Sequence, residues 1–314
     1  MTSLNGWSFH PFPAFAPTLY PNTAFWNATN PSKNLTYQIQ LSWPFSWSSS
    51  PNLTTTSNRT ALTLYVLDGN ALGTTAAEAF KRRPPPAPSQ PEGLVVSVGY
   101  PLTDSVYAIS QRAIDFTPPL PPPQTPPSGA DDFLAFISGT LRPWVRKRVF
   151  PSVTFRRDAL YGHSFGGLFV VYALISQPEA FDTFLAASPS LWWNRGYILD
   201  EVSNRLGSLA GSATPVGLWP TANQSRPAVV ISYGDLEQFP VRRRKETEAE
   251  FQARKRTIMT RFNSSMTVNC HELFDRIKGS GKMRDVVLKE YAGQDHNSVA
   301  ASAITDGLEY FIDW

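Results

Sequence analysis

Runs of apolar residues that end in small or polar residues recur along this chain from residue 61 onward. They are ALTLYVLDGN (61–70), LVVSVGYP (94–101), DALYGHSFGG (158–167), FDTFLAASPS (181–190), AVVISYGDLEQ (228–238) and DVVLKEYAG (285–293). Short apolar runs bounded by turn residues are typical of strands that are buried on both faces. Because helix-compatible stretches separate the runs, the pattern predicts an α/β fold with a mostly parallel central sheet and helices on both faces.

Three other patterns complete this outline. The segment LTYQIQLSW (35–43) alternates apolar and polar residues and predicts a strand at a sheet edge. The segment 131–148 has acidic residues at its start, basic residues at its end and apolar residues at helical spacing, which predicts an amphipathic helix. Proline-rich segments at 84–91 and 118–127 exclude helix and inner strand. We expect a single domain spanning 1–314, with these two segments as surface insertions.

Composition supports a large core and argues against a polyanionic partner. Apolar residues make up 42% of the 314 residues, and the formal net charge is only +3. The basic runs 242–245 and 254–256 alternate with glutamates, so we expect a solvated helix face rather than an anion-binding patch. Neither a nucleic acid nor a membrane is expected as a partner.

Cysteine and histidine usage bears on compartment and cofactors. Cys270 is the only cysteine, so no internal disulfide is possible. The first residues lack the basic and apolar regions of a secretory signal, which predicts a cytoplasmic protein. No cluster of histidine and cysteine suggests a metal, and we expect no cofactor.

The stretch YGHSFGG (161–167) places Ser164 between a predicted strand and a predicted helix. In α/β-hydrolases such a strained turn carries the nucleophile, and glycines flank it because side chains would collide with the neighbouring strand and helix. The Phe165 N–H, at the start of the helix, would then stabilise an oxyanion. The alternative is an ordinary serine N-cap in a glycine turn.

A serine nucleophile needs a base and an acid that orients the base. Of the four histidines, His296 follows the last strand and precedes the terminal helix, where this fold carries its base. Asp235 and Glu237 both follow the strand AVVISY, and spacing does not choose between them as the acid. A second oxyanion donor is expected in the turn 67–70, with the Asn70 N–H preferred and that of Gly69 second.

Eight sequence blocks together resemble a known family. They are YVLDGNA (65–71), SVGYP (97–101), RAIDFTPP (112–119), SGADDFLAF (128–136), GHSFGGLF (162–169), SPSLWWN (188–194), GDLEQ (234–238) and DHNSV (295–299). From about Tyr37 to the C-terminus, the chain resembles the putative-esterase family of α/β-hydrolases. Within that family it is most similar to siderophore esterases: fungal esterases of triacetylfusarinine C or fusarinine C, and bacterial enterobactin and salmochelin esterases.

The resemblance implies an intracellular serine esterase with Ser164 as nucleophile, His296 as base and Glu237 as acid. It implies that the substrate is a siderophore such as triacetylfusarinine C or fusarinine C, which brings its own iron. The implied substrate-binding residues are Gly69, Tyr100, Arg112, Trp192 and Trp193. The two indoles either form an apolar wall near the serine or include one core residue, and Arg112 either faces the substrate or only pairs with Asp115. A general acyl or feruloyl esterase and a non-catalytic siderophore-binding relative are the alternative functions.

Overall fold

A computed structural model describes residues 2–11, 21–47, 59–83, 85, 87, 90–101, 105–123, 127–207, 226–261 and 265–313. The chain divides into two compact units, which we call unit 1 (1–160 with 308–314) and unit 2 (161–307). Parts of both proline-rich segments, namely 84, 86, 88, 89 and 124–126, lie outside the described residues. The expectation of a single domain stays a prediction.

Unit 1 begins with an antiparallel meander that sequence patterning did not predict in full. Its strands are β1 (Thr2–Leu4), β2 (Trp7–Pro11), β3 (Thr23–Asn30) and β4 (Leu35–Ser42), with a short 3₁₀ turn at Pro31–Lys33. β4 pairs with β3 on one side and with β6 (Glu92–Gly99) on the other. The prediction that 35–43 forms an edge strand is therefore wrong. Because β4 lies inside the sheet, even its polar residues Gln38 and Gln40 are buried.

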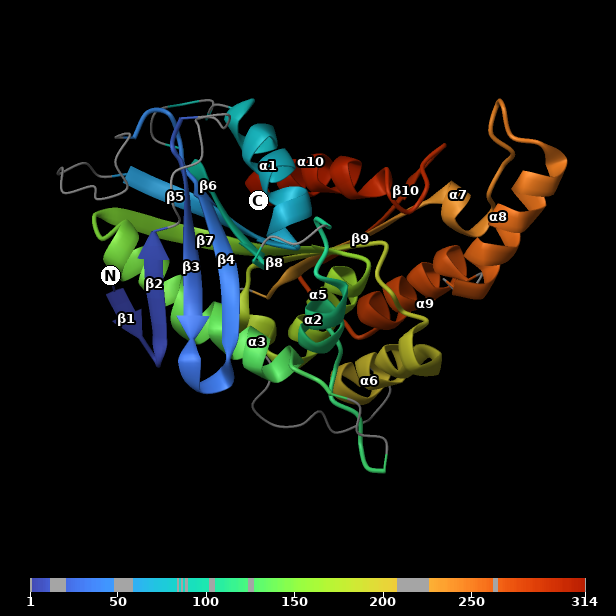
Figure 1. Cartoon of the computed structure of the whole chain (residues 1–314), viewed down its shortest axis with the longest axis horizontal. Coiled ribbons are helices and arrows are strands. Elements are labelled where there is room, and N and C mark those ends of the chain that lie inside the picture. Colours follow the sequence, from blue (N-terminus) through green and yellow to red (C-terminus); the bar gives the residue numbers. More distant parts are fainter. Residues whose placement is uncertain are drawn as a thin grey trace. The chain divides into compact units, whose positions relative to one another are not determined.

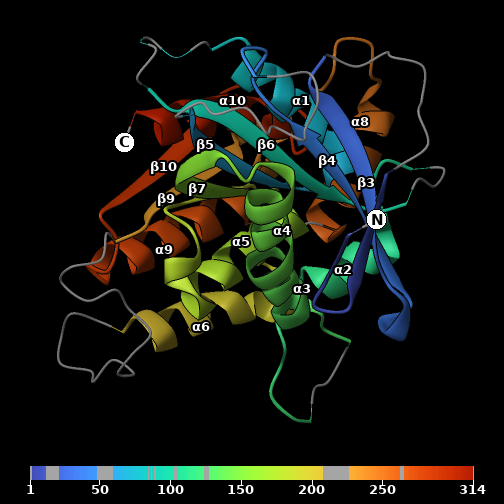
Figure 2. The ribbon, with the colours of Figure 1, turned by 90° about the vertical axis from the view of Figure 1, so that its left-hand side faces the viewer.

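The predicted strand 61–70 is β5 (Arg59–Leu67), which runs parallel to β6 and ends at the turn that starts α1 (Gly69–Lys81). The predicted helix 131–148 is a continuous helical segment. It consists of α3 (Ala130–Phe136), a π-helical stretch (Ile137–Leu141), α4 (Arg142–Trp144) and a second π-helical stretch (Val145–Val149). In Figures 1 and 2, α1 lies on one face of the unit 1 strands, whereas α3 and α4 lie on the other. The short helix α2 spans Ile109–Asp115.

Aromatic side chains fill the face covered by α3. Tyr37 on β4 contacts Phe133 and Phe136, with ring centroids 5.2 and 4.7 Å apart. Trp7 on β2 lies 4.5 Å from the ring of Phe136. Burial of such large rings contributes most of the hydrophobic stabilisation of a core like this one.

Unit 2 contains three parallel strands whose order brings their carboxyl ends together. β8 (Thr183–Ala187) pairs with β9 (Ala228–Gly234), and β9 pairs with β10 (Asp285–Tyr291). β7 (Val153–His163) enters this unit at its last three residues and leads to α5 (Phe165–Ser176). These strands occupy the ranges that the apolar runs predicted, and in such sheets ligands bind at the carboxyl ends.

The helices of unit 2 lie on both faces of its strands (Figures 1 and 2). α5, α6 (Tyr197–Leu206) and α9 (Met266–Gly279) lie on one face, and α10 (Val299–Ile312) lies on the other. Ten of the twelve α5 residues are buried, as expected for a helix that is apolar all round. The remaining helical elements are 3₁₀ turns at Pro178–Ala180 and Trp193–Gly196, α7 (Asp235–Gln238) and α8 (Glu248–Arg261).

Candidate active site

Ser164 occupies a strained turn between β7 and α5. Its backbone angles are φ 62° and ψ −119°, a region that residues with a side chain rarely adopt. The surrounding backbone holds this conformation: the Ser164 N–H donates to the Ala187 carbonyl, and the Ser190 N–H donates to the Ser164 carbonyl, both at 3.0 Å. Such over-determined strain is typical of a functional position.

Two glycines allow this turn to form because a side chain on either would meet backbone. A Cβ atom on Gly162 would lie 2.2 Å from the Gly166 carbonyl oxygen. On Gly167, it would lie 2.8 Å from the Ala187 carbonyl oxygen and 2.9 Å from Cα of Pro189. Gly162 thus satisfies the steric requirement that the sequence pattern implied, and the close approach of backbone to Gly167 is a second requirement that the structure adds.

The structure brings His296 and Glu237 together. The imidazole Nδ1 lies 2.5 Å from Oε2 of Glu237. The other carboxylate oxygen, Oε1, accepts hydrogen bonds from the Ser188 hydroxyl at 2.6 Å and from the Gly234 N–H at 2.7 Å. The Glu237 side chain is only 3% exposed, and that of His296 is 19% exposed. A buried carboxylate held by two neutral donors is well placed to orient an imidazole and to stabilise its charged form.

The two other carboxylates near this loop have different partners. Asp235 accepts a hydrogen bond from the Gly293 N–H at 2.8 Å, which ties α7 to the turn after β10. Asp295 accepts from the backbone N–H groups of Asn297 and Ser298, both at 3.1 Å, just before α10. Of the two acids that spacing left open, it is Glu237 that lies against His296.

His163, which directly precedes Ser164, contacts His296. The two ring centroids are 4.5 Å apart at an interplanar angle of 42°, and His163 is 4% exposed. This contact places His296 beside the serine turn. Sequence reasoning recognised that His163 belongs to the turn but missed its contact with His296, which no local pattern encodes.

Of the two predicted indoles, Trp192 lies beside the start of α5. Its ring centroid is 5.9 Å from that of Phe165, the residue after Ser164. Trp193 instead contacts Tyr197, at 6.4 Å. Both indoles are half-buried, so neither is a fully buried core residue.

In unit 1, the predicted turn 67–70 is tightly held. Asp68 has φ 52° and ψ 49°, and α1 begins at Gly69. The Asn70 side chain donates to Gln38 Oε1 at 3.1 Å and to the Tyr100 carbonyl at 2.9 Å, and it accepts from the Tyr100 N–H at 2.7 Å. Among the described residues, the backbone N–H of Asn70 has no hydrogen-bond acceptor. The Asn70 N–H is the group that we predicted from the sequence as the second oxyanion donor.

Arg112 pairs with Asp68. Its Nε and one terminal nitrogen donate to the two Asp68 oxygens at 2.9 and 2.7 Å, and both side chains are buried. The alternative that Arg112 only pairs with Asp115 is therefore wrong. A planar guanidinium forms two parallel hydrogen bonds with a carboxylate, so this pair fixes the Asp68 side chain at the start of α1.

Asp115 lies in a separate buried cluster. It accepts hydrogen bonds from the hydroxyls of Tyr37 and Tyr100 at 3.1 and 3.0 Å and from Gln111 at 2.9 Å. Burial raises the pKa of Asp115 to about 6, although these hydrogen bonds oppose the shift. Tyr100, which was a predicted substrate-binding residue, is itself only 4% exposed.

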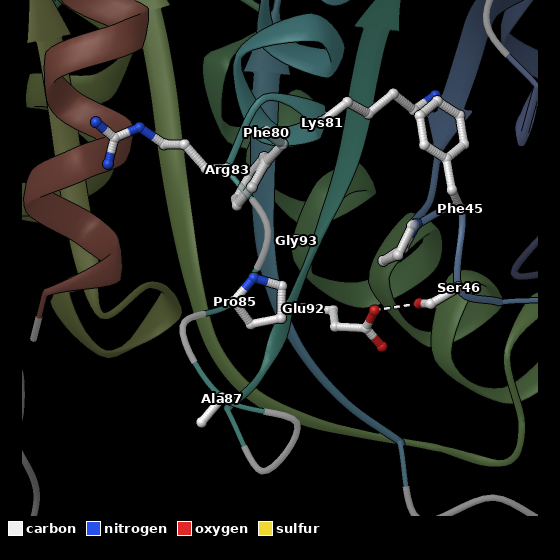
Figure 3. Close-up of a pocket in the computed structure, with 10 residues that line it drawn as sticks. Phe45, Ser46, Phe80, Lys81, Arg83, Pro85, Ala87, Glu92 and Gly93 are labelled. Carbon is white, nitrogen blue, oxygen red and sulfur yellow. Dashed lines mark hydrogen bonds between the residues drawn. The ribbon is translucent and has the colours of Figure 1, made fainter.

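Unit 1 also has a cavity of about 500 Å³ at the amino end of β6 (Figure 3). Phe80 and Lys81 line it from the end of α1, and the Glu92 carboxylate points toward Ser46. Burial lowers the pKa of Lys81 to about 8, and its Nζ lies 4.9 Å from the Phe45 ring centroid. No candidate site residue is among the described residues that line this cavity.

In the described ranges, no three His, Cys, Asp or Glu side chains gather as metal ligands would. No helix among the described residues is long and apolar enough to cross a membrane.

Comparison with known proteins identifies the family. Residues 50–275 match the family described as "Putative esterase". The siderophore enterobactin esterase of Emericella nidulans is 39% identical over 315 residues, covering 97% of each chain. The siderophore triacetylfusarinine C esterase of Aspergillus fumigatus is 36% identical over 279 residues, covering 88% of this chain and 89% of the relative.

Solved structures agree with the sequence relatives. Siderophore hydrolase EstA from Aspergillus nidulans superposes with a TM-score of 0.80 at 38% identity, over 96% of this chain and 99% of that one. This likeness shows that the fold is that of an α/β-hydrolase, as the alternation of strands and helices predicted. The chain therefore belongs to the putative esterase family of α/β-hydrolases.

Proposed function

We propose that this protein is a serine esterase in which Ser164 is the nucleophile, His296 the base and Glu237 the acid. The observation that carries the proposal is the 2.5 Å contact between His296 and the buried Glu237, in the same unit as the strained Ser164 turn. The contact between His163 and His296 supports it, because it sets the base next to the nucleophile's turn. An ordinary N-cap serine would need neither partner.

The proposed reaction proceeds through an acyl-enzyme. His296 takes the hydroxyl proton as the Ser164 oxygen attacks the ester carbonyl carbon, and Glu237 stabilises the imidazolium that forms. The Phe165 N–H and the Asn70 N–H are the proposed donors to the oxyanion. The alcohol leaves with the proton from His296. Water, deprotonated by the same histidine, then attacks the acyl carbon; the bond to the Ser164 oxygen breaks, the acid leaves, and His296 returns the proton to the serine.

The proposed substrate is a ferric or iron-free hydroxamate siderophore such as triacetylfusarinine C or fusarinine C. The name of the relative from Aspergillus fumigatus and the half-buried Trp192 beside Phe165 support this choice. In this proposal, iron arrives with the substrate, and Trp192 and Trp193 contact the siderophore. Gly69, Tyr100 and Arg112 act from buried positions. The cytoplasm is the proposed compartment, on the grounds taken from the sequence.

A catecholate trilactone is the second candidate substrate, since a relative of 39% identity is named for enterobactin. A panel of both siderophore classes and 4-nitrophenyl acetate, with products followed by mass, separates the candidates. We expect kcat/KM for the cyclic hydroxamate triester to exceed that for 4-nitrophenyl acetate at least about a hundredfold, because remote groups position the ester. Equal efficiency on all esters would leave a general esterase and exclude the siderophore assignment.

Labelling with a fluorophosphonate tests the nucleophile. We expect the wild-type protein to be labelled and Ser164→Ala to be spared. Ser190→Ala is the matched control, because the Ser190 hydroxyl lies 3.4 Å from that of Ser164 and its loss should leave labelling intact. Labelling of Ser164→Ala, or siderophore binding without any turnover in the wild type, would overturn the proposal.

A further inference from the structure

Unit 2 has a helical arm that contributes little to the core. We call residues 239–261 the α8 arm; it consists of the segment after α7 and the helix α8. None of the described side chains of α8 is buried. A helix packed on a core buries an apolar stripe, and the described part of α8 lacks such a stripe.

Polar contacts keep the α8 arm in shape. Arg254 on α8 donates to both Glu246 oxygens, at 2.7 and 2.8 Å, and to the Val241 carbonyl at 2.9 Å. The hydrogen bond from Arg254 holds the pKa of Glu246 down at about 2. Thr247 and Glu250 form a reciprocal cap at the start of the helix. These hydrogen bonds and ion pairs therefore hold the α8 arm in one conformation at neutral pH.

Beneath the arm lies a cavity of about 270 Å³. Its apolar lining comes from α7, the arm and α9, with Leu236, Pro240, Val241, Ile258 and Met266. His296 and Glu237 form another part of its wall. A group bound there would lie beside the base of the proposed reaction.

Charge in the cavity is balanced. Arg243 lies 3.4 Å from Asp295, and Arg254 is paired with Glu246. Because both arginines have carboxylate partners, the lining does not favour an anion. An uncharged, apolar ligand fits it better.

Exposed apolar side chains are frequent on the α8 arm and at the start of α9, two of the elements that line the cavity, and one of them, Val241, is itself in the lining. Of the seven large apolar side chains that are exposed among the described residues, four lie between 239 and 268: Phe239, Val241, Met259 and Val268. The Val268 N–H donates to Gln238, which brings the start of α9 against α7. Exposed apolar surface next to a pocket is typical of a binding site.

We propose that this cavity binds an apolar acyl arm of the ester substrate and thereby sets a preference for acyl chains of intermediate length. The inference rests on the proposed function, because His296 links the cavity to the reaction. At about 30 Å³ for each water-sized group, the cavity has room for roughly nine such groups. Such a volume suits an aliphatic chain of about six to eight carbons.

The test compares hydrolysis of 4-nitrophenyl octanoate and 4-nitrophenyl acetate. Each further buried methylene raises efficiency about fourfold, so burial of only two of the six additional methylenes of octanoate already gives a wild-type kcat/KM ratio, octanoate over acetate, of at least about ten. Ile258→Trp fills the cavity from α8 and should lower this ratio at least about fivefold. Val241→Trp, on the exposed part of the arm, provides a second filling variant should Ile258→Trp fail to fold.

Ala253→Trp is the matched control, since this exposed residue lies on the same helix and does not line the cavity. We expect its ratio to equal that of the wild type. A wild-type ratio near one, or an unchanged ratio in both filling variants, would overturn the acyl pocket. Ser164→Ala separates the two proposals. If Ser164→Ala hydrolyses both esters at the wild-type rate, the proposed function fails. If Ser164→Ala is inactive but Ile258→Trp keeps the wild-type kcat/KM ratio, only the acyl pocket fails.

Discussion

Replacing Glu237 by glutamine tests the proposed acid with the smallest change in shape. Oε1 of Glu237 accepts from the Ser188 hydroxyl and the Gly234 N–H, and Oε2 lies 2.5 Å from Nδ1 of His296. The Gly234 N–H can only donate, so the new amide must place its oxygen there. Its NH₂ group then faces the imidazole.

The consequence is a change of tautomer. Facing an NH₂ group, Nδ1 of His296 must accept a hydrogen bond, so the ring proton moves to Nε2, and that nitrogen can no longer take the proton of Ser164. In serine triads the wrong tautomer lowers kcat about 10⁴-fold, which corresponds to about 5.5 kcal/mol of barrier. The opposite amide orientation would set two donors against each other at Gly234 and would cost about 1–3 kcal/mol. We therefore expect kcat to fall by about 10³- to 10⁴-fold.

Steady-state rates on the best ester from the substrate panel measure this effect. Asp235→Asn is the control, because an asparagine oxygen can still accept the Gly293 N–H now bound at 2.8 Å, and kcat should stay within about tenfold of wild type. Circular dichroism should show that both variants fold. If Asp235→Asn is the more damaging change, or if Glu237→Gln keeps over about a tenth of the rate, the acid is misassigned.

Three further outcomes follow from the structure. Trp192→Ala should lower kcat/KM for the siderophore at least about tenfold more than for 4-nitrophenyl acetate, since the indole lies beside Phe165; equal losses would contradict this. Gly162→Ala would set its Cβ 2.2 Å from the Gly166 carbonyl oxygen, so we expect urea unfolding to show a loss of over about 2 kcal/mol in the free energy of unfolding. Gly139→Ala is the control and should be tolerated, because a Cβ there has open space around it. The pKa of Asp115 is about 6 in the folded protein and about 3.9 in the unfolded chain. Between these two pH values the folded state binds a proton that the unfolded state has lost. The free energy of unfolding therefore falls as the pH rises through this range, by up to about 3 kcal/mol. Urea unfolding at pH 4 and pH 7 should show this fall in the wild type and lose it in Asp115→Asn; the same fall in both proteins would assign it to other groups.

The chain's local patterns determined much of the fold and of the site. The apolar runs located β5 to β9 because buried strands need continuous apolar residues, whatever lies next to them. They also located β10, although this strand lies at the sheet edge and none of its residues is buried. Ser164 could be singled out because the turn that it occupies is local, and its glycines are needed within a few residues of it. The strands β1 to β3 were missed, because most of their described side chains are only partly buried and give no clear period.

Only the tertiary structure decided which distant groups meet. Asp235 and Glu237 both follow β9 and both reach the loop after β10, where Asp235 accepts from the Gly293 N–H and Glu237 contacts His296. Arg112 is three residues from Asp115 but pairs with Asp68, because the ends of β5 and α2 lie together in the fold. The cavity beneath the α8 arm likewise joins residues from α7, α8, α9 and the loop after β10. Contacts of this kind join segments that lie far apart in the sequence, and they depend on how strands pair and helices pack in the folded chain.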